Sequence, residues 1–220
     1  MKNIFARGGI EFLAVFLGIA LSLWVDDYRE SKELSNRLAD DYKKIYFEVK
    51  SNIKNIENII SKNNDYILIE EELIDILNGR EPYKYENVVT LIDKLTTPTY
   101  FGTTTAYRTS VASGRFNTSE NDTLAEHISL LYEHYFVRLS LNGDLIDERM
   151  RDFEKEFAMP YFKSRYNQEN IDTLALNKYF FSNTFHNGIL YLHDLRKNWY
   201  MERLIDTKNQ LYKVRDLLKP

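Results

Sequence analysis

Residues 34–60, LSNRLADDYKKIYFEVKSNIKNIENII, carry an apolar stripe that predicts a long α-helix. Its apolar side chains recur at intervals of three and four residues, which places them on one face of a helix. Lys, Glu, Asn and Asp occupy the other faces. We therefore expect a helix with one buried side that ends near Asn63 and packs against its own domain or in a coiled coil with a second copy. The stripe consists of Leu34, Leu38, Tyr42, Ile45, Val49, Ile53, Ile56 and Ile60.

The composition of the whole chain indicates the same class of fold. Its 220 residues include only 8 Gly and 4 Pro, and no alternation of apolar and polar residues persists anywhere. Few chain breakers and abundant helix formers favour long helices over the many turns of an all-β fold. We therefore predict an all-α protein with one core, because single domains usually contain about 100–200 residues.

Two shorter helices are predicted after the first. DYILIEEELIDILNGREP (65–82) predicts a second helix that stops at Gly79 and Pro82, with its run of three glutamates on a solvated face. ENVVTLIDKL (86–95) predicts another helix that ends before Pro98. These segments continue the helical pattern of the first stripe without any β-type alternation.

A long helix is expected after a turn at Gly114. Ser119 and Asp122 match the [ST]-x-x-[DE] capping box, and an apolar helical period then continues until Pro160. The last long helix is expected to start near Phe185 or Gly188, with Leu192, Leu195 and Trp199 on its apolar face. It reaches the C-terminus after a small slip in the period before Leu204. We expect these helices to form an antiparallel bundle.

The run GGIEFLAVFLGIALSLWVDDY (8–28) predicts a transmembrane helix that continues into the long helix. No residue from Phe12 to Val25 is charged, and extension back to Ile4 gives about 22 residues, or about 33 Å of helix. Arg7 and Glu11 lie four residues apart, so they face the same side of a helix. Arg7 can reach the lipid headgroups while it partly neutralises the carboxylate.

A cleaved signal peptide and a helix in a soluble core are the alternatives for this run. The N-terminus is basic, and Ala-Leu-Ser at 20–22 fits a small-x-small cleavage sequence. Glu11, however, interrupts a region that is normally free of acid in signal peptides. Trp24 and Tyr28 lie where an interfacial aromatic belt would anchor a retained helix. We therefore favour a retained span with its membrane boundaries at Arg7, Trp24 and Tyr28.

The charges that flank the run predict its orientation. Lys2 and Arg7 precede it, whereas DDYRESKE (26–33) follows it and is acidic on balance. The more basic end should stay in the cytoplasm. We therefore expect a single-pass protein of the bacterial inner membrane, with a membrane anchor at 1–28 and a periplasmic α-helical domain at 29–220.

The membrane run also contains a stripe of small residues. Ala14, Gly18 and Ser22 recur every four residues, and Glu11 lies three residues before Ala14 on the same side. Small side chains let another helix approach closely, so we predict that these four residues form a helix–helix interface. The alternative is that Glu11, near the membrane boundary, only reaches interfacial water.

Several classes of function are disfavoured. The formal net charge is -4 with basic and acidic residues intermixed, so no nucleic-acid partner is expected. The chain has no Cys, and no nucleotide-binding or hydrolase motif occurs, so we expect no enzymatic activity and no cofactor. His127 and His134 lie seven residues apart, as do His186 and His193. That spacing is about 10 Å along a helix, too far for one metal ion, and we interpret all four as ordinary helical histidines.

Two stretches of the chain match a known pattern. Glu11, Gly18 and Tyr28 supply an acid, a glycine seven residues later and an aromatic residue ten beyond it. SVASGRFNTSENDTLAEHISLLYEHYF (110–136) supplies a Ser-Gly pair, a turn with Asn and a helix that ends in paired aromatic residues. In both respects the chain resembles an uncharacterised bacterial family of small single-span membrane proteins, classed as a domain of unknown function. The matching positions in the second stretch are Ser113, Gly114, Asn117, Tyr132 and Tyr135.

One position departs from the pattern of that family. Its usual Gly directly before the Glu is Ile10 here, with Gly9 one position earlier. The resemblance implies a topology and a location, and it brings no activity, substrate or catalytic residue.

Two hypotheses for the function follow. The first is a membrane-anchored helical accessory or scaffold protein, which forms a homo-oligomer or binds another membrane protein. The alternative is a periplasmic helical bundle that senses a ligand and passes the change down the helix at 29–63. Sensing would require a membrane partner, because about seven residues before the span are too few for an output of their own.

Overall fold

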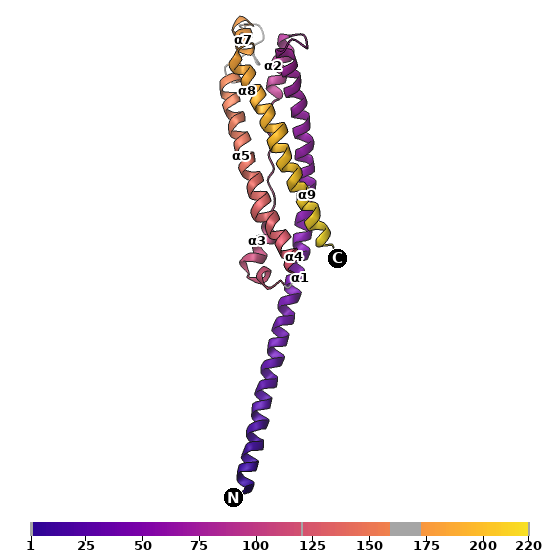
Figure 1. The fold of residues 1–220 in the computed structure, drawn as a ribbon, viewed down its shortest axis with the longest axis vertical. Coiled ribbons are helices and arrows are strands. Elements are labelled where there is room, and N and C mark those ends of the chain that lie inside the picture. Colours follow the sequence, from indigo (N-terminus) through magenta and orange to yellow (C-terminus); the bar gives the residue numbers. More distant parts are fainter. Residues whose placement is uncertain (1, 120, 159–172, 220) are drawn as a thin grey trace. The chain divides into compact units, whose positions relative to one another are not determined.

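The computed structural model describes residues 2–119, 121–158 and 173–219 (Figure 1). No β-strand occurs among these residues, which confirms the all-α prediction. The predicted helix end at Pro160 lies outside the described residues. In chain order, the elements are α1 (Lys2–Leu77), α2 (Tyr85–Lys94), α3 (Thr105–Ala112), the 3-10 helix η1 (Arg115–Thr118), α4 (Asp122–Ser129), the π-helical turn η2 (Leu130–Tyr135), α5 (Phe136–Phe153), the π-helical turn η3 (Glu154–Ala158), α7 (Thr173–Phe180), α8 (Asn183–Asp194), the π-helical turn η6 (Leu195–Tyr200) and α9 (Met201–Leu217).

The first helix, α1, continues past its predicted end at Asn63 and reaches Leu77. The two helices expected on either side of that residue are therefore one. The buried face continues through Asn63 and Glu70, which have no exposed surface, so the prediction of a solvated glutamate run is wrong for Glu70. Neither Gly nor Pro interrupts the helix there. It ends just before Gly79, as predicted, and this glycine adopts a φ of 72°.

The chain divides into two compact units. Unit 1 comprises Met1–Ile45 and Thr105–Asp122, and unit 2 comprises Tyr46–Thr104 and Thr123–Pro220. Since α1 runs from residue 2 to residue 77, it contributes to both units.

Unit 1 contains the turn that the sequence places at Gly114. This residue lies between α3 and η1 with a φ of 75°, which favours glycine. The ring of Phe116 packs edge-on against Tyr107 and Tyr42, with centroids 5.3 Å and 6.5 Å away. These three aromatic side chains join α3, η1 and α1 within the unit.

The helix after unit 1 starts later than the predicted capping box requires. Because α4 begins at Asp122, this residue is the first of the helix and not the third after a cap at Ser119. The hydroxyl of Ser119 instead accepts the backbone N–H of Asn121 at 3.2 Å and the hydroxyl of Tyr42 at 2.6 Å. Ser119 therefore ties its turn to α1.

In unit 2, α5 runs in the same direction as α1. Tyr132, just before α5, donates a hydrogen bond to Glu48 at 2.8 Å. Further along both helices, Met150 lies in the same buried cluster as Leu73. Residue numbers thus rise together along the two helices, and the antiparallel prediction is wrong for this pair.

The C-terminal helix of α8, η6 and α9 runs opposite to α1, as an antiparallel bundle requires. Arg196 is bonded to Glu70, whereas Tyr212, further along, is bonded to Glu57, nearer the start of α1. After α2, residues 95–104 form an extended segment that runs back beside α1, opposite to its direction (Figure 1). This segment allows the later helix α5 to run parallel to α1. This segment was not predicted from the sequence, because its residues carry no periodicity.

The slip in the period of the last helix has a structural cause. Ser182 caps the helix, which begins at Asn183, slightly before its predicted start. The π-helical turn η6 then accommodates an additional residue and shifts the buried face. Trp199, predicted on the apolar stripe, is 55% exposed, and Tyr200 is buried in its place. The period resumes at Leu204, which has no exposed surface.

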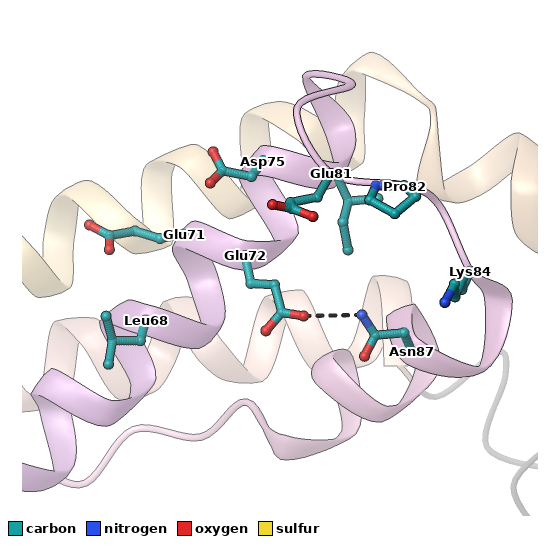
Figure 2. A pocket seen from close by; sticks show the side chains of 9 residues that line it. Leu68, Glu71, Glu72, Asp75, Glu81, Pro82, Lys84 and Asn87 are labelled. Atoms are coloured by element: carbon teal, nitrogen blue, oxygen red, sulfur yellow. Dashed lines mark hydrogen bonds between the residues drawn. The ribbon is translucent and has the colours of Figure 1, made fainter.

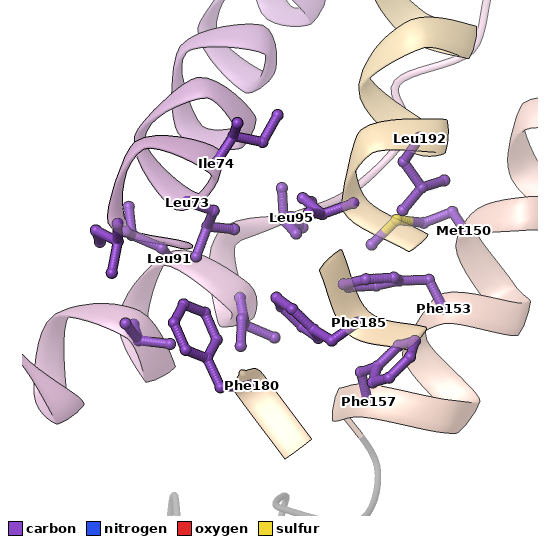
Figure 3. Packing of buried hydrophobic residues seen from close by; sticks show 14 residues of the cluster. Leu73, Ile74, Leu91, Leu95, Met150, Phe153, Phe157, Phe180, Phe185 and Leu192 are labelled. Atoms are coloured by element: carbon purple, nitrogen blue, oxygen red, sulfur yellow. The ribbon is translucent and has the colours of Figure 1, made fainter. Parts of the chain in front are cut away.

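One end of unit 2 is filled by an apolar cluster with several aromatic rings (Figure 3). The rings of Phe153, Phe157, Phe180 and Phe185 lie with neighbouring centroids 5.0–5.5 Å apart, in tilted and edge-on arrangements that aromatic pairs favour. Part of the aromatic content therefore belongs to the core. The cluster consists of Leu73, Ile74, Ile76, Val88, Leu91, Ile92, Leu95, Met150, Phe153, Phe157, Phe180, Phe185, Ile189 and Leu192.

Candidate functional site

The predicted interface residues share one side of the N-terminal part of α1. Glu11, Ala14, Gly18 and Ser22 are all exposed, and their spacing of three, four and four residues keeps them on the same helix face. A Cβ atom built on Gly18 would have no described atom within 4 Å. The structure thus aligns these residues and leaves room beside Gly18 for a second helix.

The predicted boundary residues lie on the same helix. Trp24 and Tyr28 are exposed, and their rings stack with centroids 6.1 Å apart. Of Arg7 the structure describes the helical backbone and not the side chain.

Large apolar side chains surround α1 throughout the run from Phe12 to Val25. Their exposed fractions range from 44% at Val25 to 69% at Phe12. A helix that is apolar on all sides normally lies in a protein core or a membrane. Among the described residues, no helix has the length and apolar character needed to cross a membrane, so the predicted span is not supported. The exposed residues are Phe12, Leu13, Val15, Phe16, Leu17, Ile19, Leu21, Leu23, Trp24 and Val25.

A second candidate site lies inside unit 2 around Arg196, whose side chain has no exposed surface. Its Nε donates to Oε1 of Glu70, Nη1 donates to Oδ1 of Asn63 and Nη2 donates to the carbonyl of Thr96, each at 2.8 Å. The fixed fork of a guanidinium suits three acceptors in different directions. Because every nitrogen is engaged by the protein, Arg196 joins segments of the chain and is not available to a ligand.

Asn63 extends this network in two directions. Its amide nitrogen donates to the carbonyl of Ile59 at 2.9 Å, one turn earlier on α1, and to the carbonyl of Pro98 at 2.9 Å. Its amide oxygen accepts the bond from Arg196. A buried amide with donors and acceptor all engaged carries no desolvation penalty for an unpaired group.

Further side chains of α1 bind the backbone of the extended segment at residues 95–104. Asn52 accepts the N–H of Thr103 at 2.9 Å and donates to its carbonyl at 2.8 Å, as a neighbouring β-strand would. Asn55 donates to the carbonyl of Phe101 at 3.0 Å. A segment that runs between helices must find such partners, because buried unpaired backbone groups are costly.

The other side of the segment is held by α5 and η6. The hydroxyl of Tyr200 accepts the N–H of Tyr100 at 2.8 Å. Burial raises the pKa of Tyr200 to about 12, so this hydroxyl stays neutral near pH 7. Asp147 accepts the hydroxyls of Thr97 at 2.6 Å and Thr99 at 3.2 Å.

Gly102 permits a close approach within this segment. A Cβ atom at this position would lie 2.8 Å from the ring of Phe136 and 3.1 Å from that of Tyr100. Any larger residue would force these rings apart.

Asn63, Glu70 and Arg196 were not predicted as site residues, although the sequence pattern around each contains a signal. Asn63 follows Ile56 by seven residues, Glu70 follows Asn63 by seven, and Arg196 follows Leu192 by four. Each is therefore a polar residue on an apolar helix face. Polar residues at such positions are candidates for a buried network.

Unit 1 contains a separate ion pair. Asp41, 4% exposed, accepts a hydrogen bond from Nε of Arg115 at 2.6 Å, and Nζ of Lys44 lies 3.7 Å away. Burial acts to raise the pKa of Asp41, but the hydrogen bond from Arg115 and the two positive charges outweigh it. The pKa therefore lies below its ordinary value of 3.8.

An acidic hollow of about 490 Å³ opens where α1 turns into α2 (Figure 2). Glu71, Glu72, Asp75 and Glu81 line it together with one cation, Lys84. In chemical terms, the hollow would attract cations over anions. Asn87, which also lines it, donates a hydrogen bond to Glu72 at 3.0 Å.

The described histidines do not assemble into a metal centre. His127 lies beside Gln210, with Nδ1 3.5 Å from the amide nitrogen, while His193 lies 3.5 Å from Glu70. Within residues 2–119, 121–158 and 173–219, no group of three or more His, Asp or Glu side chains is placed to bind a metal ion.

Replacement of Arg196 should destabilise unit 2 strongly. Arg196→Met leaves the Glu70 carboxylate buried without its cation, which typically costs about 3–5 kcal/mol. Urea unfolding of the full chain, followed by circular dichroism, measures the loss. Arg80→Met is the control, because it removes a surface ion pair with Asp75 that is worth about 0–1 kcal/mol. Equal losses for both variants would contradict the role of Arg196.

The ion pair of Asp41 should stabilise the protein only above a low pH. Because the pKa is lowered in the folded state, the stabilisation is complete above about 3.8, the unfolded value, and is lost as the pH falls below it. Asp41→Asn should therefore lower Tm at pH 6, and the difference from the wild type should shrink below pH 3.8. Asp40→Asn, on the exposed neighbour, is the control. A difference for Asp41→Asn that does not change with pH would contradict this account.

Comparisons with known proteins identify a family. No curated protein and no solved structure matches the chain. The model of one family, described as a family of unknown function (DUF6090), matches residues 11–177. This match covers part of the N-terminal apolar run, both expected motif stretches and much of unit 2. The chain therefore belongs to the DUF6090 family of unknown function.

Proposed function

We propose that the chain is a membrane-anchored helical accessory or scaffold protein, which associates with a second copy or with another envelope protein. The observation that carries this proposal is the ring of exposed apolar side chains on α1 between Phe12 and Val25. Burial of apolar surface is worth about 25 cal/mol per Å². Because this segment carries apolar surface on every side, its burial free energy is most favourable where every side is covered. A lipid bilayer covers every side of a helix.

The dimensions of the segment specify how it would fit a membrane. The uncharged stretch from Phe12 to Val25 covers about 21 Å at 1.5 Å per residue, less than the hydrocarbon thickness of about 30 Å. The span must therefore include residues back to Ile4. In this arrangement Arg7 and Glu11 lie near one boundary, and Trp24 lies near the other.

The same charges specify the orientation that we propose. The basic residues Lys2 and Arg7 stay in the cytoplasm, and residues 29–220 lie in the periplasm of a bacterial inner membrane. Unit 2 then presents its helices outside the membrane, where they are available to a partner.

Insertion of a charge in the middle of the run should release the protein from membranes. Leu17→Arg places a guanidinium at the centre of the apolar segment, at a cost of about 2.5–3.5 kcal/mol for insertion. The measurement is the membrane-bound fraction after alkaline extraction. Leu141→Arg is the matched control, because Leu141 is also an exposed leucine on a helix but belongs to α5. The same membrane-bound fraction for both variants would contradict the anchor.

The orientation predicts the activity of a C-terminal reporter. Alkaline phosphatase fused after Lys219 should be active, because this enzyme requires an oxidising compartment for its disulfides. β-Galactosidase fused at the same position is the control and should be inactive. The reverse result would place residues 29–220 on the cytoplasmic side.

The small-residue face should mediate association within the membrane. Gly18→Ile fills the open space beside Gly18 and should reduce crosslinking of the isolated 1–33 segment, because model helices lose about 1–2 kcal/mol when such contacts are removed. Leu17→Ile, one residue around the helix, should leave the crosslinking unchanged.

If the Glu11 carboxylate also forms a hydrogen bond across the interface, Glu11→Gln should retain more association than Glu11→Leu. Equal crosslinking for wild type and Gly18→Ile would refute this interface.

A further inference from the structure

His193 on α8 lies between two carboxylates of α1. Its Nδ1 is 3.5 Å from Oε2 of Glu70, and its Nε2 is 3.8 Å from Oε1 of Glu71. The imidazole side chain is only 16% exposed, and that of Glu70 has no exposed surface. Both Nδ1 of His193 and Oε2 of Glu70 are buried without a hydrogen-bond partner. Two orphaned polar atoms therefore face each other at slightly more than hydrogen-bond distance.

The protonation state of the ring decides whether these atoms can pair. A neutral imidazole carries one N–H, so one of its nitrogens always points a lone pair at a carboxylate oxygen. An imidazolium carries an N–H on both nitrogens and can donate to both acidic residues at once. Only the doubly protonated ring matches an acceptor on each side.

The charges of the neighbouring side chains do not add up to a net positive charge that would oppose protonation of the ring. Glu70 already accepts the bond from Arg196 with Oε1, so its Oε2 is the oxygen that remains. Glu71 is bonded to Lys197 at 2.6 Å. These two carboxylates and two cations sum to zero, and protonation adds one positive charge between two acidic groups. Among the described ion pairs, none places a charged group of α2 or α5 on the ring of His193.

We propose that His193 is a proton-operated clasp between α8 and α1. When the imidazole binds its second proton, Nδ1 donates to Glu70 and Nε2 donates to Glu71, and the C-terminal helix is held more firmly against α1. When the proton leaves, the neutral ring can donate to only one of the two carboxylates, so at least one contact is lost, while the Arg196 network and the Lys197–Glu71 bond remain. Acidification therefore closes the clasp, and removal of the proton opens it.

The clasp gives the stability of unit 2 a definite dependence on pH. The protonated ring of the folded protein has two acceptors that the unfolded chain lacks, so protonation of the ring should raise the free energy of unfolding. Glutamine at position 193 can still donate one hydrogen bond but cannot titrate. His193→Gln should therefore fold and lose the response.

Thermal unfolding of the full chain in nonionic detergent, between pH 8.0 and 5.5, tests the proposal. The Tm of the wild type should rise by about 2–4 °C relative to His193→Gln as the pH falls. His134→Gln is the control, because His134 is exposed on η2, and it should follow the wild type. Parallel pH profiles for wild type and His193→Gln would overturn the clasp.

A second variant keeps the test decisive if His193→Gln fails to fold. Glu71→Gln retains the imidazole and removes the charge of the partly exposed acceptor, so it should reduce the pH-dependent rise in Tm. An undiminished rise in Glu71→Gln would overturn the role of Glu71 in the clasp. In the wild type, the ring resonances of His193 should show protonation accompanied by a shift of the Glu70 carboxylate carbon. Titration of His193 without that shift would overturn its contact with Glu70.

Discussion

The buried guanidinium of Arg196 is the interaction on which the arrangement of unit 2 depends. It binds Glu70 and Asn63 on α1 and the carbonyl of Thr96, so that one side chain joins three parts of the chain. Burial of a charge is costly, and this one is tolerated because every partner is in place. The same contacts fix the extended return segment, which allows α5 to run parallel to α1 while the C-terminal helix runs antiparallel.

The sequence predicted the helices better than their connections. Apolar periodicity located α2 and the slip caused by η6, and the glycine at 114 located the turn there, because each depends on local packing or on backbone conformation. It failed at Asn63 and Glu70, because polar residues on a buried face resemble the end of a stripe. The extended segment was missed for a related reason: its hydrogen bonds come from side chains distant in the sequence, and no local pattern encodes them.

The difference between local patterns and contacts distant in the sequence also explains what could be predicted of the candidate sites. The small-residue stripe from Glu11 to Ser22 is a local pattern, and the structure aligns it on one helix face. The approach of His193 to Glu70 brings together residues 123 positions apart in the sequence and follows only from the packing of α8 on α1. The chain thus combines a helical unit joined by a buried polar network around Arg196 with an apolar segment whose side chains are exposed.

The proposed burial of that segment in lipid can be measured directly, because the chain contains no cysteine. Val15→Cys, Phe16→Cys and Leu17→Cys sample successive directions around α1, since consecutive residues differ by about 100°. In proteoliposomes of the purified protein, all three should resist a membrane-impermeant maleimide until the protein is denatured, while Leu141→Cys reacts at once. Reaction of all three at the rate of Leu141→Cys, or protection confined to one direction, would contradict burial in lipid.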